Sequence, residues 1–547
     1  MVTSTLQTAN HVSRQVRSTI RRFFGFSASV GGAAALLGIA YFVSRLLALV
    51  RDRILATGFG ASAELDVYFA AFRIPDFLFN VLIFGAISAA FIPVFAGYLA
   101  KRQKRVADRV GSTVLTAATI LLLVTAGLAW IFAPQIAPLV APGFTGEQLG
   151  QVTDLTRVML LSPIFFGIGG IFGSVLHSHQ RFLAYATAPL LYNLGIIGGA
   201  IVAPELGLIY LAWGVAAGAF LQMLIQLIAG LRTGFSFRPS LHLRHPGVRR
   251  IFWLMIPTTI GAGILQINYL VETIVASTLQ HGALSQFFLA TSLSMVPVSV
   301  VGASFATAVF PVLAKAASTR QTGLYVESLV TVIRKILFVI IPVSIAIMLL
   351  RAQIVRLVYG AGQFDFEDTR FVTSILGILA VSLFAQALIP LLSKAFYAIR
   401  NTKTPVVIAG ISMLVNVSLA FPLAAQLGVV GLAVAFSFAS IIQLALLFFF
   451  LSGKIPAIED RAMLSAITRI VFCSLVAGAA IYGTLYGVAY LIEDIQSTQT
   501  VAFFLIQASL ASLVGASVYL MLAFALKLPE ARLLILRARH PLSADDY

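Results

Sequence analysis

The chain has 547 residues, of which 59% are hydrophobic and only 10% are charged. It contains about a dozen or more apolar runs of roughly 20 residues, the length that an α-helix needs to cross the hydrocarbon layer of a bilayer. This composition excludes a soluble globular protein and predicts an all-α polytopic membrane protein. The single cysteine, Cys473, lies in an apolar run, so neither a disulfide framework nor a thiolate metal cluster is expected.

The first 26 residues form a basic segment that includes Arg14, Arg17, Arg21 and Arg22. The apolar run that follows is too long for a signal peptide and lacks a small-residue cleavage pattern. We therefore expect a retained cytoplasmic segment. Its basic and aromatic residues suit either an anionic membrane surface or a disordered tail.

The apolar runs predict about fourteen transmembrane helices. In chain order they cover residues 27–57, 64–98, 109–133, 153–178, 183–203, 207–231, 250–278, 285–315, 327–350, 371–399, 404–424, 427–451, 464–491 and 499–527.

An internal repeat divides these helices into two groups of six. Five residues recur at a constant offset of 221: Leu206, Gly207, Leu211, Ala212 and Gln222 return as Leu427, Gly428, Leu432, Ala433 and Gln443. Because six is even, both groups enter the membrane from the same side, which predicts two parallel, pseudo-symmetric lobes with a site between them. The predicted parts are an N-terminal lobe (27–231), a cytoplasmic linker (232–249), a C-terminal lobe (250–451), two extra helices (464–527) and a cytoplasmic tail (528–547).

Lysine and arginine are concentrated in alternate connections. The opposite connections 133–151, 203–206, 279–285 and 493–500 contain neither residue, whereas 351–370 mixes both signs of charge. The positive-inside rule then places both termini in the cytoplasm. The net charge of +17 follows mostly from this topology, so no nucleic-acid partner is expected.

Charged residues crowd into the first two predicted helices, which are mostly apolar, and the most notable are Arg45, Arg51, Asp52, Asp66, Arg73 and Asp76. A charge inside a bilayer costs several kcal/mol unless it is paired or faces water, so these residues mark a candidate functional site. Guanidinium groups suit phosphate because their fixed fork of donors bonds two oxygens at once. We therefore predict a site for an anionic cargo at Arg45, Arg51 and Arg73, with Asp52 and Asp66 as acids of the same cavity. The alternative is that residues 51–53 only mark the external end of the first helix.

Glu272 lies in the middle of the seventh predicted helix, where an isolated ionised carboxylate is costly. It is expected to be protonated, exposed to water or bound to a cation, and Asn416 is a candidate partner. Two interpretations remain open for this pair, a plain interhelical hydrogen bond and a proton or sodium site.

Several chemistries have no motif in the sequence. There is no GxxxxGK[ST] phosphate loop, no HExxH and no CxxC, and His177 and His179 lack a third ligand. We therefore predict a transporter rather than an enzyme, with no cofactor.

Five motifs together resemble the MurJ/MviN family of lipid II flippases. They are SRLLALVRD (44–52), DVYFAAFRIPDFLFNVLIFGAISAAFIPVF (66–95), APGF (141–144), YGAGQFDFEDT (359–369) and AFYAIRNTKTPV (395–406). The resemblance covers about residues 30–525. It implies two six-helix lobes around a cationic cavity, and two extra helices that form a groove for a polyprenyl tail.

The resemblance also implies a function. Lipid II, the undecaprenyl-diphosphate-linked peptidoglycan precursor, would cross the bacterial inner membrane by alternating access, driven by membrane potential, sodium or protons. Arg45 and Arg51 fall on positions of the family's diphosphate-binding arginines, and Asp52, Asp66 and Arg73 match acidic, acidic and basic positions. Expected partners are lipid II or a similar polyprenyl-diphosphate glycolipid, the bilayer, and cell-wall synthesis proteins.

The chain departs from the family pattern at five positions where charged residues are usual: Phe79, Asn80, Phe84, Ser292 and Met295. These departures favour an alternative, an exporter of another undecaprenyl-linked glycan or of a cation-coupled amphipathic small molecule. A third interpretation is a membrane scaffold without transport activity, which the cost of the intramembrane charges opposes.

Overall fold

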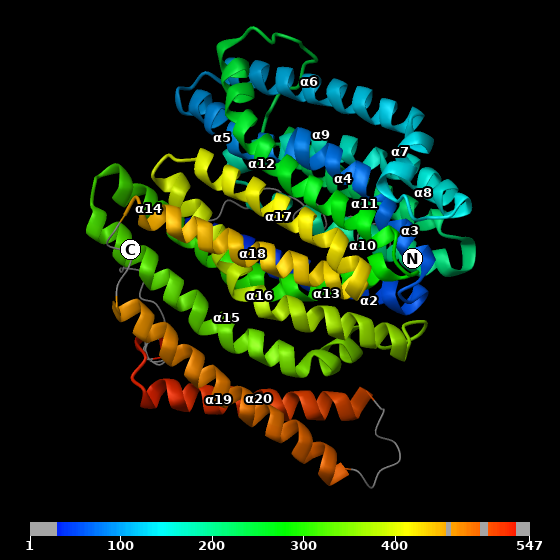
Figure 1. Cartoon of the computed structure of the whole chain (residues 1–547). Helices are drawn as coiled ribbons and strands as arrows, with labels where there is room; N and C mark the ends of the chain where they lie inside the picture. The colour runs from blue at the N-terminus through cyan, green and yellow to red at the C-terminus, as the bar shows by residue number, and fades with distance from the viewer. Residues whose placement is uncertain (1–29, 456–460, 493–500, 532–547) are drawn as a thin grey trace, which may run out of the picture. The chain divides into compact units, whose positions relative to one another are not determined.

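The computed structural model describes residues 30–455, 461–492 and 501–531, and all of the regular elements in these ranges are helices (Figure 1). The prediction of an all-α polytopic membrane protein is confirmed. The predicted N-terminal segment 1–26 and most of the predicted tail 528–547 lie outside the described residues.

Tertiary contacts divide the described chain into two compact units. Unit 1 covers residues 30–58 and 63–274, and unit 2 covers residues 59–62 together with those from 275 onward. The helices of unit 1 are α2 (Val30–Phe59), α3 (Ala63–Ala71), α4 (Arg73–Phe79), η1 (Asn80–Phe84), α5 (Gly85–Ala100), α6 (Lys104–Ile131), α7 (Ala133–Val140), α8 (Gly146–Met159), α9 (Leu161–Ser178), α10 (Phe182–Leu206), α11 (Ile209–Leu231) and α12 (Pro246–Ser277). The helices of unit 2 are α13 (Ala283–Pro297), η2 (Val298–Ala303), α14 (Ser304–Ser318), α15 (Thr322–Tyr359), α16 (Phe366–Ala398), α17 (Lys403–Leu427), α18 (Val429–Ser452), α19 (Arg461–Ile492) and α20 (Val501–Ala525).

Twelve of the described helices are long and apolar enough to cross a membrane, against fourteen predicted. The first two predicted segments are not among the twelve. Both segments include residues whose side chains lie outside the described ones. The count of fourteen therefore stays a prediction.

The unit boundary differs from the lobe boundary that the repeat predicts. Helix α12 is the first helix of the predicted C-terminal lobe (250–451), yet its contacts group it with unit 1 up to residue 274. The predicted lobes describe a sequence repeat, whereas the units describe contacts, and the predicted boundaries stay a prediction.

Two π-helical turns, η1 and η2, lie in the second predicted helix of each lobe. Pro297 directly precedes η2, and Pro75 lies in α4 shortly before η1. Proline removes a backbone donor and clashes with the preceding turn, which favours a local change in the hydrogen-bond pattern. π-Helical turns occur frequently at functional sites, and η1 directly follows the charged helix α4.

The connection 59–62 between α2 and α3 is held by unit 2. The Ala61 N–H donates to Asp368 Oδ2 at 2.9 Å. Gly60 has a φ of 66°, and a Cβ at this position would stand 2.8 Å from the carbonyl oxygen of Gln363. Glycine suits position 60 because the backbone there is left-handed and lies too close to the Gln363 carbonyl oxygen to leave room for a side chain.

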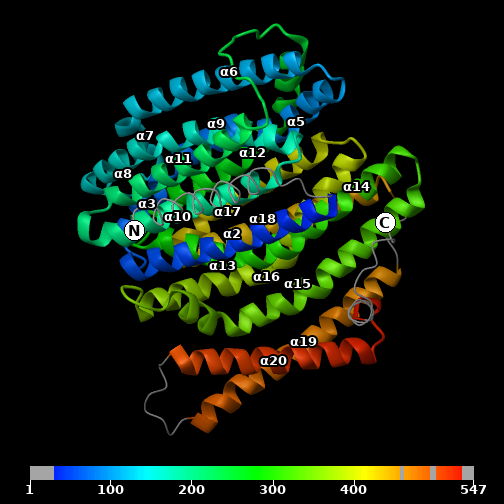
Figure 2. The same ribbon diagram turned by 180° about the vertical axis from the view of Figure 1, so that it is seen from behind.

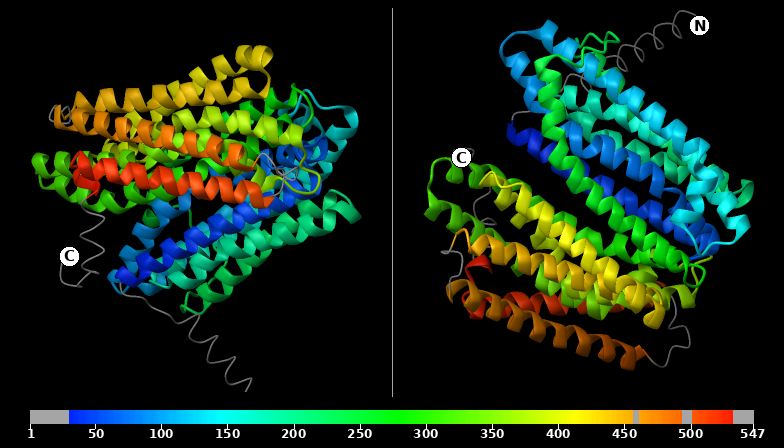
Figure 3. Two further views of the ribbon diagram at one scale, coloured as in Figure 1. Left: turned by 90° about the horizontal axis from the view of Figure 1, so that it is seen from below. Right: turned by 45° about the horizontal axis from the view of Figure 1, so that its top comes forward.

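In unit 2, the two C-terminal helices α19 and α20 pack against each other and against α15 (Figures 2 and 3). The Tyr519 hydroxyl donates to the Phe338 carbonyl oxygen at 2.7 Å. Beyond α20, Glu530 forms an ion pair with Arg334, with Oε1 and Nε 2.8 Å apart, and the Glu530 side chain is only 7% exposed. These contacts attach α20 and the residues after it to α15.

Helices α10 and α11 of unit 1 approach each other through glycines on both sides. A Cβ at Gly199 would stand 2.9 Å from the Cα of Gly214 and 2.7 Å from the Tyr210 carbonyl oxygen. Gly195 meets Gly218 in the same way. Small residues at such crossings let helix backbones come close inside a membrane.

We expect Gly199→Ala to lower the free energy of unfolding by about 1–3 kcal/mol, because the added methyl group forces α10 and α11 apart. The matched control is Gly198→Ala on the same helix, where a Cβ would meet nothing within 4 Å. Unfolding of the purified protein in mixed micelles measures both variants. Equal stability of the two variants would contradict close packing at this crossing.

Candidate functional site

The charged residues of α2 are held by a buried ion pair. Arg51 donates from Nε and Nη2 to the same oxygen of Asp52, Oδ1, at 2.9 and 2.7 Å. The Asp52 side chain is fully buried, whereas that of Arg51 is 18% exposed. Arg51 also donates from Nη1 to Asn193 Oδ1 of α10 at 3.3 Å. The guanidinium therefore joins α2 to α10 and keeps a partly accessible face.

Arg73, the first residue of α4, makes the second group of polar contacts in unit 1. Its Nε donates to Thr273 Oγ1 of α12 at 2.6 Å, and its Cζ lies 5.9 Å from the centre of the Tyr269 ring. The Thr273 side chain is fully buried. One guanidinium thus joins α4 to α12 by a hydrogen bond and a cation–π contact.

Asp76 connects the two arginines electrostatically. It lies one turn after Arg73 on α4, and its charge interacts with both Arg73 and Arg51. Tyr68 of α3 and Tyr192 of α10 lie in the field of Arg51. These residues form one cluster, which we call the arginine cluster: Arg51, Asp52, Arg73, Asp76, Asn193, Glu272 and Thr273.

Glu272 belongs to this cluster. It is 5% exposed, accepts from Asn268 Nδ2 at 2.7 Å, and interacts electrostatically with Arg73. Its expected partner Asn416 is 3% exposed on α17 and belongs to unit 2. The pairing of Glu272 with Asn416 stays a prediction.

The structure also places the other two predicted site residues, Arg45 and Asp66. Arg45 is half-buried on α2, two turns before Asp52, and Asp66 is 2% exposed on α3. Their roles in cargo binding stay predictions.

Sequence reasoning missed the uncharged members of the cluster. Asn193 and Thr273 each lie far along the chain from the arginine that they contact. A polar amide in the otherwise apolar run 182–206 was the available signal, since such groups need a partner inside a membrane. The sequence did not indicate which arginine Asn193 and Thr273 would each contact.

The family-pattern departures in unit 1 have structural roles. Phe79 packs against Phe166 with ring centres 5.0 Å apart. Asn80, the first residue of η1, donates from Nδ2 to the Asp76 carbonyl oxygen of α4 at 2.9 Å. The Phe84 side chain lies outside the described side chains, and in unit 2 Ser292 and Met295 are half-buried on α13.

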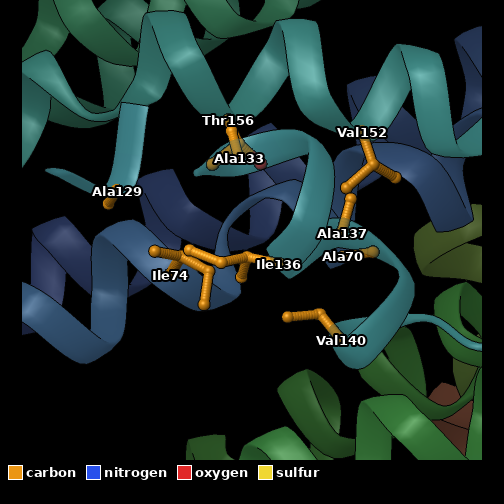
Figure 4. Close-up of a pocket in the computed structure, with 9 residues that line it drawn as sticks. All are labelled: Ala70, Ile74, Ala129, Ala133, Ile136, Ala137, Val140, Val152 and Thr156. Carbon is orange, nitrogen blue, oxygen red and sulfur yellow. The ribbon is translucent and has the colours of Figure 1, made fainter. Parts of the chain in front are cut away.

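A small cavity lies between α3, α4, α6, α7 and α8 (Figure 4). Its volume is about 10 Å³, and apart from Thr156 it is lined by alanine, isoleucine and valine. An apolar space of this size does not hold an ordered water, so it is a packing void rather than a binding site. Within the described residues, no group of three or more His, Cys, Asp or Glu side chains is placed to hold a metal ion.

Comparison with known proteins gives consistent results. The family model described as "Lipid II flippase MurJ" matches residues 55–492. A probable lipid II flippase MurJ of Rhizobium meliloti (strain 1021) is 30% identical, over 95% of this chain and 96% of its own length. The lipid II flippase MurJ of Burkholderia cenocepacia is 31% identical, over 69% of this chain and 75% of its own length.

Solved structures agree with these sequence matches. The inward closed conformation of a lipid II flippase MurJ superposes with a TM-score of 0.75 at 27% identity, covering 89% of this chain and 98% of that one. An inward-facing multidrug resistance MATE family transporter of the MOP superfamily reaches a TM-score of 0.61 at 19% identity, which shows a shared fold alone.

We expect Thr273→Val to lower the free energy of unfolding by about 1 kcal/mol or more, because the near-isosteric change removes the acceptor of Arg73 Nε. Thr258→Val on the same helix is the matched control, since that hydroxyl donates to the Met255 carbonyl oxygen of its own helix. Thermal unfolding in mixed micelles compares them. If both variants unfold at the same temperature, the hydrogen bond between Arg73 and Thr273 does not contribute to stability.

Proposed function

Because the chain belongs to the lipid II flippase MurJ family, we propose that the protein carries lipid II from the cytoplasmic to the outer leaflet of the bacterial inner membrane. The chain covers nearly the full length of the Rhizobium meliloti relative, which supports transfer of the whole activity. Flipping would supply the peptidoglycan precursor to the outer surface for cell-wall synthesis. Both termini would lie in the cytoplasm, as the distribution of lysine and arginine predicts.

The arginine cluster is the observation that carries the proposed substrate site. Arg73 uses one donor on Thr273, and a guanidinium has five N–H donors in total. The remaining donors suit two oxygens of a diphosphate. Arg51 is held rigidly by Asp52 and Asn193, so little side-chain entropy would be lost when it meets the same anion.

The acids of the cluster provide a mechanism for coupling. Asp52, Asp76 and Glu272 outnumber Arg51 and Arg73, so a fully ionised cluster has no excess positive charge to attract a diphosphate. A proton or a sodium ion on Glu272 would cancel one negative charge and strengthen the attraction. Cargo binding and cation binding would then favour each other, as linkage requires.

We expect Arg51→Ala and Arg73→Ala to abolish function, because each removes a donor group for the diphosphate and leaves a buried acid or hydroxyl without its partner. The measurement is growth of cells depleted of their own lipid II flippase that express each variant, together with Arg45→Ala, at matched membrane abundance. Arg105→Ala is the control because its side chain is exposed at the start of α6.

Wild type and the Arg105 variant should restore growth. Rescue by every arginine variant would place the diphosphate elsewhere. Failure of well-folded wild type would favour the alternative cargo, another undecaprenyl-linked glycan, and would make Ser292 and Met295 candidate substrate determinants.

We expect Glu272→Gln to remove the response of lipid II flipping to an imposed proton or sodium gradient, because the amide neither ionises nor binds a proton at neutral pH. Proteoliposomes with each gradient set separately measure this response. Asp154→Asn is the control, since this acid forms an exposed ion pair with Arg157 at 3.8 Å. An unchanged gradient response in the Glu272 variant would exclude this residue as the coupling site.

A further inference from the structure

A line of hydroxyl groups follows α13, η2 and α14 of unit 2. Its members are Ser292, Ser299, Ser304 and Thr307. Ser299 lies two turns after Ser292, and Thr307 lies almost one turn after Ser304, so each pair shares a helix face. The π-turn η2 joins the two pairs, because Ser304 Oγ donates across it to the Ser299 carbonyl oxygen at 3.3 Å. The wider turn therefore brings all four hydroxyl groups to one side.

The hydroxyl groups of this line use their protons within their own helix. Ser299 Oγ donates to the Met295 carbonyl oxygen, and Thr307 Oγ1 donates to the Ala303 carbonyl oxygen, each at 2.7 Å. A hydroxyl group has one donor and two acceptor lone pairs, so these groups can still accept hydrogen bonds. Ser304 and Thr307 are exposed. The line therefore favours a ligand that brings O–H or N–H donors.

Lys394 of α16 adds a positive charge to this line. Its Nζ donates to Thr307 Oγ1 at 2.6 Å, and α16 packs against α14. The Lys394 side chain is half-buried, and none of the ion pairs within the described residues includes it. An ammonium group has three donors, so Lys394 can bind an anion while it keeps its bond to Thr307.

The position of Thr307 indicates the direction of the Lys394 side chain. Lys394 lies one turn before the end of α16 at Ala398, whereas Thr307 lies three turns before the end of α14 at Ser318. Side chains of an α-helix tilt toward its N-terminus, which favours this direction. Both helices end on the cytoplasmic side in the proposed topology, so the ammonium group is directed into the membrane-spanning part. A lysine held there almost always faces water or an anion, because a charge in lipid is costly.

We propose that Lys394 and the hydroxyl line bind the glycan and peptide of lipid II, with Lys394 on a carboxylate of the peptide. This inference rests on the proposed function and adds a subsite formed by unit 2 alone. Sugar hydroxyl groups and peptide N–H groups are donors that the hydroxyl line can accept. A single ammonium group matches the charge of one carboxylate, whereas a diphosphate suits the paired donors of arginine. The subsite lets the protein distinguish a charged peptide from a neutral one.

The test measures equilibrium binding of three lipids to the purified full-length protein in mixed micelles. They are lipid II, lipid II with its peptide carboxylates amidated, and undecaprenyl diphosphate, which has neither glycan nor peptide. Wild type should bind lipid II about tenfold more tightly than the amidated lipid, because amidation removes a hydrogen-bonded ion pair. Equal affinity of wild type for these two lipids would overturn recognition of a carboxylate without any substitution.

Substitutions then locate the recognition. Lys394→Met should bind lipid II about tenfold more weakly than wild type and undecaprenyl diphosphate equally well, because only the carboxylate loses its partner. Lys394→Arg keeps the charge and should retain most of the preference for lipid II over the amidated lipid. Thr307→Val should reduce this preference, since it removes the acceptor that orients the ammonium group.

The control is Lys315→Met, which removes an equal charge from an exposed position in the last turn of α14. It should bind all three lipids as wild type does. An equal loss of lipid II and undecaprenyl diphosphate in Lys394→Met would place the lysine on the diphosphate and overturn the subsite. Unchanged lipid II binding by Lys394→Met would overturn the subsite alone, whereas absence of lipid II binding by wild type would overturn the proposed cargo as well.

Discussion

The organisation of unit 1 depends on the cost of burying charge. Asp52 is fully enclosed, and an enclosed carboxylate is stable only beside a donor group that holds its charge. Removing one partner of such a pair typically costs about 3–5 kcal/mol, whereas an exposed pair such as Arg157 and Asp154 contributes about 0–1 kcal/mol. The contacts of Arg51 and Arg73 therefore fix how α2, α4, α10 and α12 lie against one another. The same contacts gather two arginines and three acids in the arginine cluster.

The sequence predicted the helices and the region of the candidate site, because hydrophobicity and charge can be read from each residue without knowledge of its tertiary contacts. Apolar runs of helix length identified the helices, and the charges at 45–76 identified the region of the candidate site. Partners were harder to predict, because Asn193 and Thr273 reach their arginines only through tertiary packing. Glu272 illustrates the limit: its cost was evident from its position, but its proximity to Arg73 was not. Periodicity also could not reveal η1, because a π-turn differs from an α-turn by a single residue.

Unit 2 depends on apolar packing more than on buried charge. Its interior is mostly aliphatic, and buried hydroxyl groups there bond within the unit, as Ser382 does with Ser437 at 3.0 Å. Polar attachments concentrate where α19 and α20 meet α15, through Tyr519, Gln507 and Glu530. Inside a bilayer, apolar side chains contact lipid about as favourably as they contact another helix, so apolar burial alone gives little specificity for one neighbouring helix. These few polar contacts therefore add specificity to the apolar packing of the C-terminal pair on α15.

The turn η1 sets the angular register between two parts of one chain segment. Each residue of an α-helix advances the side chains by about 100° around the axis, and a π-turn accommodates one residue more than an α-turn. Arg73 before the turn contacts α12, while α5 after the turn packs on α6 and α9. Deleting one residue from η1 would leave the sequences of α4 and α5 unchanged. It would rotate the side chains of α5 by roughly a quarter of a circle relative to those of α4. The length of η1 is therefore constrained, because it sets the direction of the α5 side chains relative to Arg73.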